Sequence, residues 1–242
     1  MLIFPAIDLR GGQVVRLTEG DYDRMTVYSG DPLAIAQSFL DAGAEYLHTV
    51  DLDAAKDEGQ KNFAIIARLA KESGLKLEVG GGARDEESAR RYLDAGVERV
   101  ILGTAAITDW DFFTAMGQKY PGRIAAGVDV RDGFIAIKGW LQTSAVSCYD
   151  FCRRLDGTGV DTVICTDISR DGAMGGANRA LYRELSDRFP SLRLIASGGV
   201  SSMEDIAALR DMGLYGAIVG KAYYVGAVDL PEAIRLAGEV GE

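Results

Sequence analysis

Residues 81–106 read GGARDEESARRYLDAGVERVILGTAA, and residues 198–223 read GGVSSMEDIAALRDMGLYGAIVGKAY. The two stretches align without gaps at an offset of 117 residues, and 8 of the 26 aligned positions are identical. Each begins with two glycines, continues through a segment of helical pattern, and ends in a short apolar run followed by another glycine. A helix followed by a short buried strand is the repeating part of a β/α fold. The sequence therefore predicts one β/α unit in two related copies.

The chain outside these stretches repeats in the same order. Residues 6–9, AIDL, match residues 127–130, GVDV, at an offset of 121, and residues 50–52, VDL, match residues 166–168, TDI, at an offset of 116. Glycine ends many helices in unrelated β/α units, but three matched blocks in one order favour internal duplication over chance. We therefore expect two similar halves, at about residues 1–120 and 121–242.

Eight short apolar runs alternate with segments of helical pattern. The runs are continuous, which is typical of strands buried on both faces of a parallel sheet. Each unit then takes about 30 residues, the size of one βαβ step. We predict a single-domain (β/α)8 TIM barrel over residues 1–242, built from two half-barrels, with an open doubly wound sheet as the alternative. The expected strands are residues 2–7, 46–50, 75–79, 99–102, 124–128, 162–165, 192–196 and 217–219.

Composition and charge exclude several classes of protein. The chain has 26 Lys and Arg against 36 Asp and Glu, a net charge of −10, which argues against nucleic-acid binding. Apolar stretches stay below the ~18 residues of a membrane span, and the N-terminus does not resemble a signal peptide. Cys148, Cys152 and Cys165 form no CxxC pair, so we expect reduced thiols and a cytoplasmic protein without disulfides or zinc.

Glycines follow the expected strands at matched places in both halves. Glycine lets backbone N–H groups approach an anion, and a following helix N-terminus adds partial positive charge. In barrels a phosphate site typically follows strands 7 and 8, and its duplicate here follows strands 3 and 4. Two facing sites predict a small substrate with a phosphate at each end, although a tight turn explains each glycine alone. The expected phosphate-binding residues are Gly81, Gly82, Gly103, Thr104, Gly198, Gly199, Gly220 and Lys221.

A pair of carboxylates is the second repeated feature. Asp8 ends the first expected strand and Asp129 the fifth, and these strands face each other across an eight-stranded barrel. Each aspartate alone is explained by helix capping or a loop turn. As a pair they suit general acid–base catalysis, in which one group donates a proton while the other removes one. We therefore predict that Asp8 and Asp129 are catalytic.

Further polar side chains lie near the strand ends. The segments after the first and fifth strands are the longest loops, and their mixture of glycine and apolar residues predicts ordered lids that exclude water. The sequence, with one histidine, shows no Ser/His/Asp arrangement and no cluster with metal-ligand spacing. His48 is explained equally well as a core imidazole. The candidates for substrate positioning are Arg16, His48, Arg84, Trp140, Thr166 and Asp171.

Motifs along the whole chain carry a family resemblance. They are PAIDLRGGQVVRLTEGDYD, LHTVDLDAA, VGGGAR, GTAA, GVDVRDG, GW, TDISRDG, ASGGVSS and GKA, between Pro5 and Ala222. The sequence resembles the histidine-biosynthesis isomerases that convert the aminoaldose ProFAR (phosphoribosylformimino-5-aminoimidazole carboxamide ribotide) into the aminoketose PRFAR. The resemblance implies duplicated half-barrels, an Amadori rearrangement, no cofactor and a substrate with two phosphates.

The resemblance also implies roles for single residues. Asp8 is then the general base and Asp129 the general acid, Trp140 stacks on the substrate, and Arg84 contacts it. Lys221 stands where arginine is common in the family, which retains the positive charge.

Three other functions stay open at this point. The sister imidazole glycerol phosphate cyclase is also a duplicated barrel, but it needs a glutaminase partner and usually starts differently. An isomerase that also accepts phosphoribosylanthranilate is the second alternative, and a non-catalytic phosphosugar-binding barrel is the third. The presence of both Asp8 and Asp129 argues against the last. We expect a monomer whose partner is a small molecule.

Overall fold

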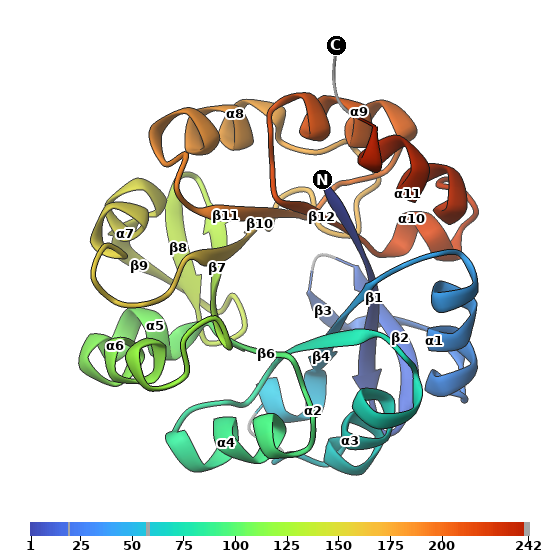
Figure 1. Cartoon of the computed structure of the whole chain (residues 1–242), viewed down its shortest axis with the longest axis horizontal. Helices are drawn as coiled ribbons and strands as arrows, with labels where there is room; N and C mark the ends of the chain where they lie inside the picture. Colours follow the sequence, from blue (N-terminus) through green and yellow to red (C-terminus); the bar gives the residue numbers. More distant parts are fainter. Residues whose placement is uncertain (19, 57–58, 240–242) are drawn as a thin grey trace.

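The chain folds into a closed barrel of eight parallel strands. The computed structural model describes residues 1–18, 20–56 and 59–239. Within these residues the barrel order is β10-β11-β12-β1-β4-β5-β6-β7, and pairing of β7 with β10 closes it. Helices surround the strands as an outer ring (Figure 1). The predicted (β/α)8 architecture is confirmed, and the open-sheet alternative is wrong because the sheet has no free edge among these eight strands.

The strands of the described chain are these: β1 Leu2–Arg10, β2 Gln13–Thr18, β3 Asp21–Ser29, β4 Tyr46–Asp51, β5 Lys76–Gly80, β6 Arg99–Leu102, β7 Ile124–Arg131, β8 Phe134–Ile137, β9 Gln142–Ser147, β10 Thr162–Asp167, β11 Arg193–Ser197 and β12 Gly216–Val219.

The helices are α1 Pro32–Asp41, α2 Leu52–Ala55, α3 Phe63–Glu72, α4 Glu86–Asp94, α5 Thr104–Thr108, α6 Trp110–Lys119, α7 Cys148–Arg154, α8 Arg179–Arg188, α9 Met203–Asp211, α10 Lys221–Tyr224 and α11 Leu230–Gly238. No helix in the described ranges is long and apolar enough to cross a membrane.

Two apolar layers explain why the barrel strands are continuous hydrophobic runs. Successive side chains of a strand point to opposite faces. On β1, Ile7 and Leu9 belong to the large cluster between strands and helices, whereas Phe4 and Ala6 belong to a smaller cluster inside the barrel. Asp8 continues the inward series of Phe4 and Ala6, one step nearer the strand end. The strand that fills the core therefore also places a carboxylate at the barrel mouth.

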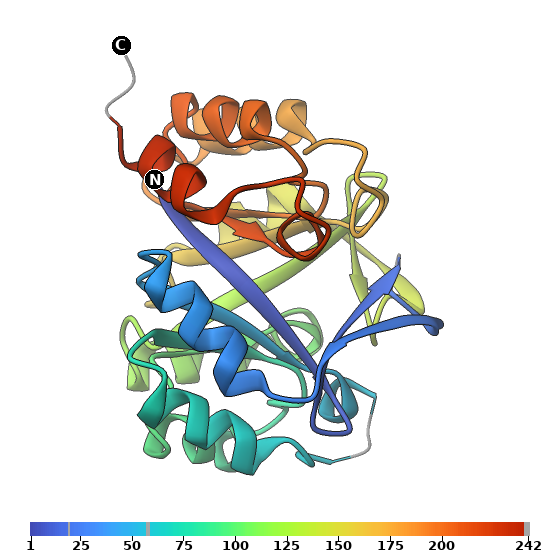
Figure 2. The same ribbon diagram turned by 90° about the vertical axis from the view of Figure 1, so that its right-hand side faces the viewer.

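The two expected lids are antiparallel hairpins, which the sequence did not predict. β1 pairs with β2 and β2 with β3, while β7 pairs with β8 and β8 with β9. Figure 2 shows both hairpins, β2–β3 in blue and β8–β9 in yellow-green, projecting at the end of the barrel opposite the N-terminus. We call them the first lid (β2–β3) and the second lid (β8–β9). The two lids follow β1 and β7, the first and fifth strands of the barrel. The boundary between the two halves near residue 120 stays a prediction.

Candidate active site

The first carboxylate is held by a cation from the first lid. Asp8 lies in β1 and its side chain is 12% exposed. Arg16, in β2, donates from Nη1 to Asp8 Oδ2 at 2.6 Å. Burial acts to lower the pKa of Arg16, but nearby charges, with Asp8 first among them, outweigh burial and raise it. Asp8 is thus a carboxylate with a permanent counter-ion in contact.

The second carboxylate has neutral partners instead. Asp129 lies in β7, and the indole Nε1 of Trp140 in the second lid donates to its Oδ2 at 2.8 Å. A second hydrogen bond comes from the hydroxyl of Thr166 in β10. Burial raises the pKa of Asp129, and these two bonds and the charge of His48 only partly oppose the rise. The surroundings of Asp129 therefore favour its protonated form more than water does for an ordinary aspartate.

A third carboxyl group, Asp171, joins the predicted pair. Burial, assisted by repulsion from Asp8 and Asp129, raises the pKa of Asp171 to about 6, against attraction by Arg16 and His48. Charges interact this strongly only over short distances in a partly buried site. Five positions that the sequence singled out, namely Asp8, Asp129, Asp171, Arg16 and His48, thus share one electrostatic environment.

The two lids touch above this group. A Cβ atom at Gly20, the turn of the first lid, would overlap the ring of Trp140. Trp140 has φ +70, a backbone conformation that costs free energy for a bulky residue and is often found at functional sites. Glycine at position 20 therefore lets the indole reach Asp129 beneath the first lid.

The Gly-Gly pairs have a steric reason that is the same in both halves. Gly81 and Gly198 have φ +96 and φ +83. A Cβ on Gly81 would overlap the carbonyl oxygen of Asp51, and one on Gly198 would lie 2.6 Å from that of Asp167. Gly82 also has a positive φ, and its Cβ would meet Ala54 at 2.5 Å. Any side chain here would push the neighbouring strand end away. The tight-turn explanation therefore accounts for these glycines without a ligand.

The single glycines begin two short helices that lack a side-chain cap. Gly103 precedes α5 and Gly220 precedes α10, and neither N-terminus receives a side-chain hydrogen bond. Their N–H groups are therefore available to an anion. A Cβ at Gly220 would overlap Nη2 of Arg16, so the guanidinium rests against this N-terminus. The Nε atom of Arg16 has no hydrogen-bond partner within the described residues.

Two predicted phosphate-binding side chains contact loops instead. Thr104 Oγ1 accepts from the backbone N–H of Lys138 in the second lid at 3.0 Å. Lys221 Nζ donates to the carbonyl of Gly172 at 2.8 Å. Both hydrogen bonds connect a predicted phosphate site to a neighbouring loop. A phosphate bound there would either replace these bonds or bind beside them.

Arg84 does not contact the carboxylates in this structure. Its guanidinium donates to the carbonyl oxygens of Ala54 and Ala55, at 3.2 and 3.3 Å, and the residue is exposed. These two hydrogen bonds connect the loop after β5 to α2, at the rim of the barrel.

Sequence reasoning missed a pair of asparagines and a tyrosine. Asn62 donates to Asp51, and Asn178 donates to Asp167, at 2.7 and 2.6 Å. The spacing of the asparagines equals the 116-residue spacing of the aspartates, so the duplication contained this signal. Tyr224, whose hydroxyl donates to Ala6 O at 2.8 Å, lies under the Arg16 guanidinium. Tyr224 lies just after the GKA motif, and no sequence pattern marked it as a functional residue.

The described residues contain no group of three or more His, Cys, Asp or Glu side chains arranged to hold a metal ion. Cys148, Cys152 and Cys165 are free and buried.

Fold and site together define a (β/α)8 barrel with two aspartates at its mouth, each contacted by one lid. A family model described as histidine biosynthesis protein matches residues 2–229. The chain is 48% identical over 237 residues to a protein of Brachyspira hyodysenteriae, covering 98% of this chain and 99% of the relative. It is 47% identical to a Picosynechococcus protein, covering 98% and 94%, and 48% identical to a Lactococcus lactis protein, covering 97% and 99%. The chain therefore belongs to the histidine biosynthesis protein family. All three relatives are named 1-(5-phosphoribosyl)-5-((5-phosphoribosylamino)methylideneamino)imidazole-4-carboxamide isomerase.

Proposed function

We propose that this protein catalyses the Amadori rearrangement of ProFAR to PRFAR in histidine biosynthesis, as an aldose–ketose isomerase without a cofactor. The observation that carries the proposal is the contrast between its two carboxylates. Asp8 contacts a guanidinium, whereas Asp129 has a raised pKa and neutral partners. A proton must be removed at one atom and supplied at another in this reaction, and the two environments favour one group for each task. The names of the relatives support the same reaction.

Each proton transfer has a donor and an acceptor in the proposed mechanism. Asp129 gives its proton to the ring oxygen of the aminoribosyl group, whose C1–O bond breaks to form a protonated Schiff base. Asp8 then removes the proton from C2, and the electron pair left behind neutralises the imine as an enolamine. Asp8, now protonated, gives a proton to C1, while Asp129, now a carboxylate, takes the hydroxyl proton at C2 as that C–O bond becomes the carbonyl; this yields the aminoketose and restores both groups. Each acid or base group contributes about 10²–10⁴-fold to such a reaction.

The two phosphates bind, in this proposal, at the N-termini of α5 and α10, on opposite sides of the mouth. The uncapped N–H groups and the guanidinium beside Gly220 support these sites. Local donors are required because the net charge of −10 repels a bisphosphate. In this proposal Trp140 contacts the sugar from the second lid, Thr166 from β10 and Asp171 from the loop after β10.

The protein works as a monomer in the cytoplasm in this proposal. Both carboxylates, both lids and both uncapped helices come from one chain. Free buried thiols at Cys148, Cys152 and Cys165 are typical of a reducing compartment.

One assay separates this function from the alternatives. Purified protein is given ProFAR without ammonia or glutaminase, and PRFAR is the expected product. A cyclase would leave ProFAR unchanged and consume PRFAR only when ammonia is supplied. A binding barrel would retain ProFAR without converting it, and either result would contradict the proposal. Phosphoribosylanthranilate as a second substrate tests dual specificity.

A further inference from the structure

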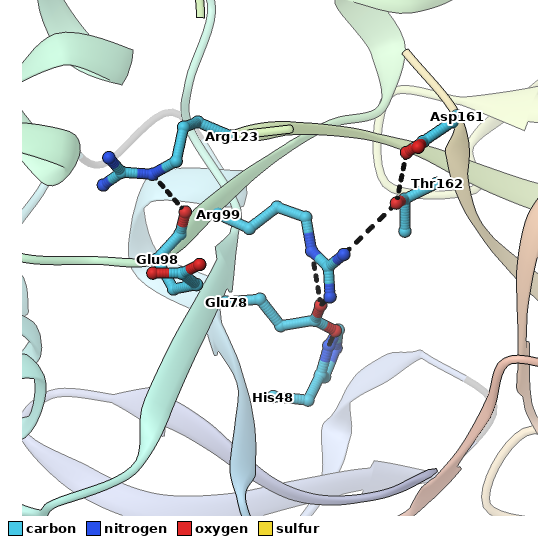
Figure 3. Close-up of polar contacts among 7 residues, drawn as sticks. All are labelled: His48, Glu78, Glu98, Arg99, Arg123, Asp161 and Thr162. Atoms are coloured by element: carbon cyan, nitrogen blue, oxygen red, sulfur yellow. Dashed lines mark hydrogen bonds and ion pairs between the residues drawn. The ribbon is translucent and has the colours of Figure 1, made fainter. Parts of the chain in front are cut away.

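A buried polar cluster lies inside the barrel, below the carboxylates. Figure 3 shows His48 from β4, Glu78 from β5 and Arg99 from β6 with the polar ends of their side chains together. The strand register places His48 beside Glu78 and Glu78 beside Arg99. Neighbouring positions of paired strands share a face. Three consecutive barrel strands therefore each supply one member of the cluster.

Glu78 is held from both sides. Its Oε1 lies 2.7 Å from His48 Nδ1, and its Oε2 accepts from Arg99 Nε at 3.1 Å and from Arg99 Nη2 at 2.9 Å. The third donor of Arg99, Nη1, reaches the hydroxyl of Thr162 at 3.2 Å. The guanidinium thus approaches the carboxylate with two donors, a geometry that fixes its orientation.

Stability does not by itself explain the cluster. The side chain of Glu78 is 0% exposed and that of Arg99 is 4% exposed. Removing two charges from water costs several kcal/mol per ion, and apolar residues of similar volume often replace a buried ion pair without loss of stability. Other inner positions are indeed apolar, with Ile164 and Ile195 among them. A charged Glu78 therefore calls for a reason beyond packing.

We look for that reason in His48, and in which of its two ring nitrogens carries the hydrogen. A carboxylate is an acceptor only, so the hydrogen between Glu78 and His48 belongs to Nδ1 of the imidazole. The other ring nitrogen, Nε2, makes no hydrogen bond within the described part of the chain. His48 lies near enough to Asp129 and Asp171 that a positive charge on its ring would lower the pKa of both carboxyl groups.

We propose that Glu78, held by Arg99, is a positioning residue for His48. It keeps the imidazole proton on Nδ1, and so leaves Nε2 available to a substrate bound near Asp129 and Asp171. The substrate part of this inference rests on the proposed function. The tautomer part concerns the free protein alone, so the two fail separately.

The single histidine of the chain makes the tautomer measurable. Protein with ¹⁵N-labelled histidine gives one imidazole in a two-bond ¹H–¹⁵N spectrum, and the expected wild-type signal is a protonated Nδ1. An imidazole protonated only at Nε2 in the folded wild-type protein would overturn the proposal, whether or not any variant folds.

Glu78→Gln then tests the cause. Arg99 has only donors, so the oxygen of the new amide must face Arg99 and its NH₂ group must face His48. Nδ1 then has to accept, and the hydrogen moves to Nε2. We expect this tautomer change together with a loss of about 10-fold or more in kcat/KM for ProFAR, because Nε2 now presents a donor to the substrate. A Glu78→Gln protein with the wild-type tautomer, or with the new tautomer and unchanged kcat/KM, contradicts the proposal.

Thr162→Val is the matched control. It removes the other hydrogen bond of Arg99 at nearly constant volume and leaves the contact between Glu78 and His48 in place. A purely structural cluster would lose thermal stability in both variants and change activity in both. The proposal predicts that Thr162→Val loses thermal stability, keeps the proton on Nδ1, and keeps kcat/KM within about twofold.

Discussion

The two halves of the barrel place the same residue type at the same point but surround it differently. Asp8 and Asp129 each end an inward-facing series on a barrel strand, and each is contacted by the lid that follows its strand. The first lid contributes the guanidinium of Arg16, whereas the second contributes the indole N–H of Trp140. A permanent cation stabilises a carboxylate, while burial with neutral donors favours the protonated acid. A repeated backbone can therefore carry a base and an acid once the lids differ.

The largest expected effect comes from removing either carboxylate. Asp8→Asn and Asp129→Asn should each lower kcat by about 10²–10⁴-fold, because each loses one proton transfer. KM should change much less, since asparagine keeps the shape and most hydrogen bonds. Steady-state kinetics with ProFAR measure both constants. Near-normal kcat in either variant would remove that residue from the mechanism.

Removing the two lid contacts one at a time should lower kcat/KM by unequal factors. Arg16→Gln removes a charge-assisted hydrogen bond and should lower kcat/KM by about 10- to 100-fold, whereas Trp140→Phe removes a neutral one and should lower it by about 10-fold or less. The double variant shows whether the two act independently, because additive free energies are expected only without coupling. Equal losses in the two single variants would mean that the charge on Arg16 has no special importance.

A smaller effect is expected where the lids meet. Gly20→Ala places a Cβ against the Trp140 ring and should displace the indole from Asp129, with a loss of a few-fold in kcat/KM. Gly133→Ala, in the turn between β7 and the second lid, is the control. Its φ is also positive, at +83, but no atom lies within 4 Å of the added Cβ. If both variants lose activity equally, backbone strain explains the loss and the lid contact does not.

The smallest effect concerns stability and pH. Because the folded protein raises the pKa of Asp171 to about 6, folding favours its protonated form. This contribution is present below the ordinary pKa of 3.8 and is lost as the pH rises through about 6. Asp171→Asn should therefore be more stable than the wild type at pH 7, on the order of 1 kcal/mol, with the difference shrinking toward about pH 4. Urea unfolding at several pH values measures this. A difference that does not vary with pH would show that Asp171 is not perturbed.

The sequence predicted the barrel because its strands are continuous apolar runs, and all eight lie where we expected them. The lids were predicted only as ordered loops, since β2–β3 and β8–β9 mix polar and apolar residues without a clear two-residue period. The Gly-Gly pairs were found by their repetition, but the backbone approach that requires Gly81 and Gly198 depends on strand ends that lie 30 and 31 residues away in sequence.

Glu78 was missed for a different reason. It stands in the run KLEVG, where one acidic residue in a predicted strand has no partner in sequence. Its partners, His48 and Arg99, lie on the neighbouring strands, 30 and 21 residues away. Only the strand register brings the three together, and a single sequence does not give the register of a parallel sheet.

The contrast between the two carboxylates is tested most directly by titrating Asp129 itself. Protein with ¹³C-labelled aspartate carboxyl groups gives a signal for Asp129 that is assigned by its loss in Asp129→Asn. We expect the pKa of this carboxyl group to lie above the ordinary aspartate value of 3.8, and higher still in Trp140→Phe, because the indole bond lowers the pKa of Asp129. A titration at or below the ordinary value would contradict the assignment of Asp129 as the acid.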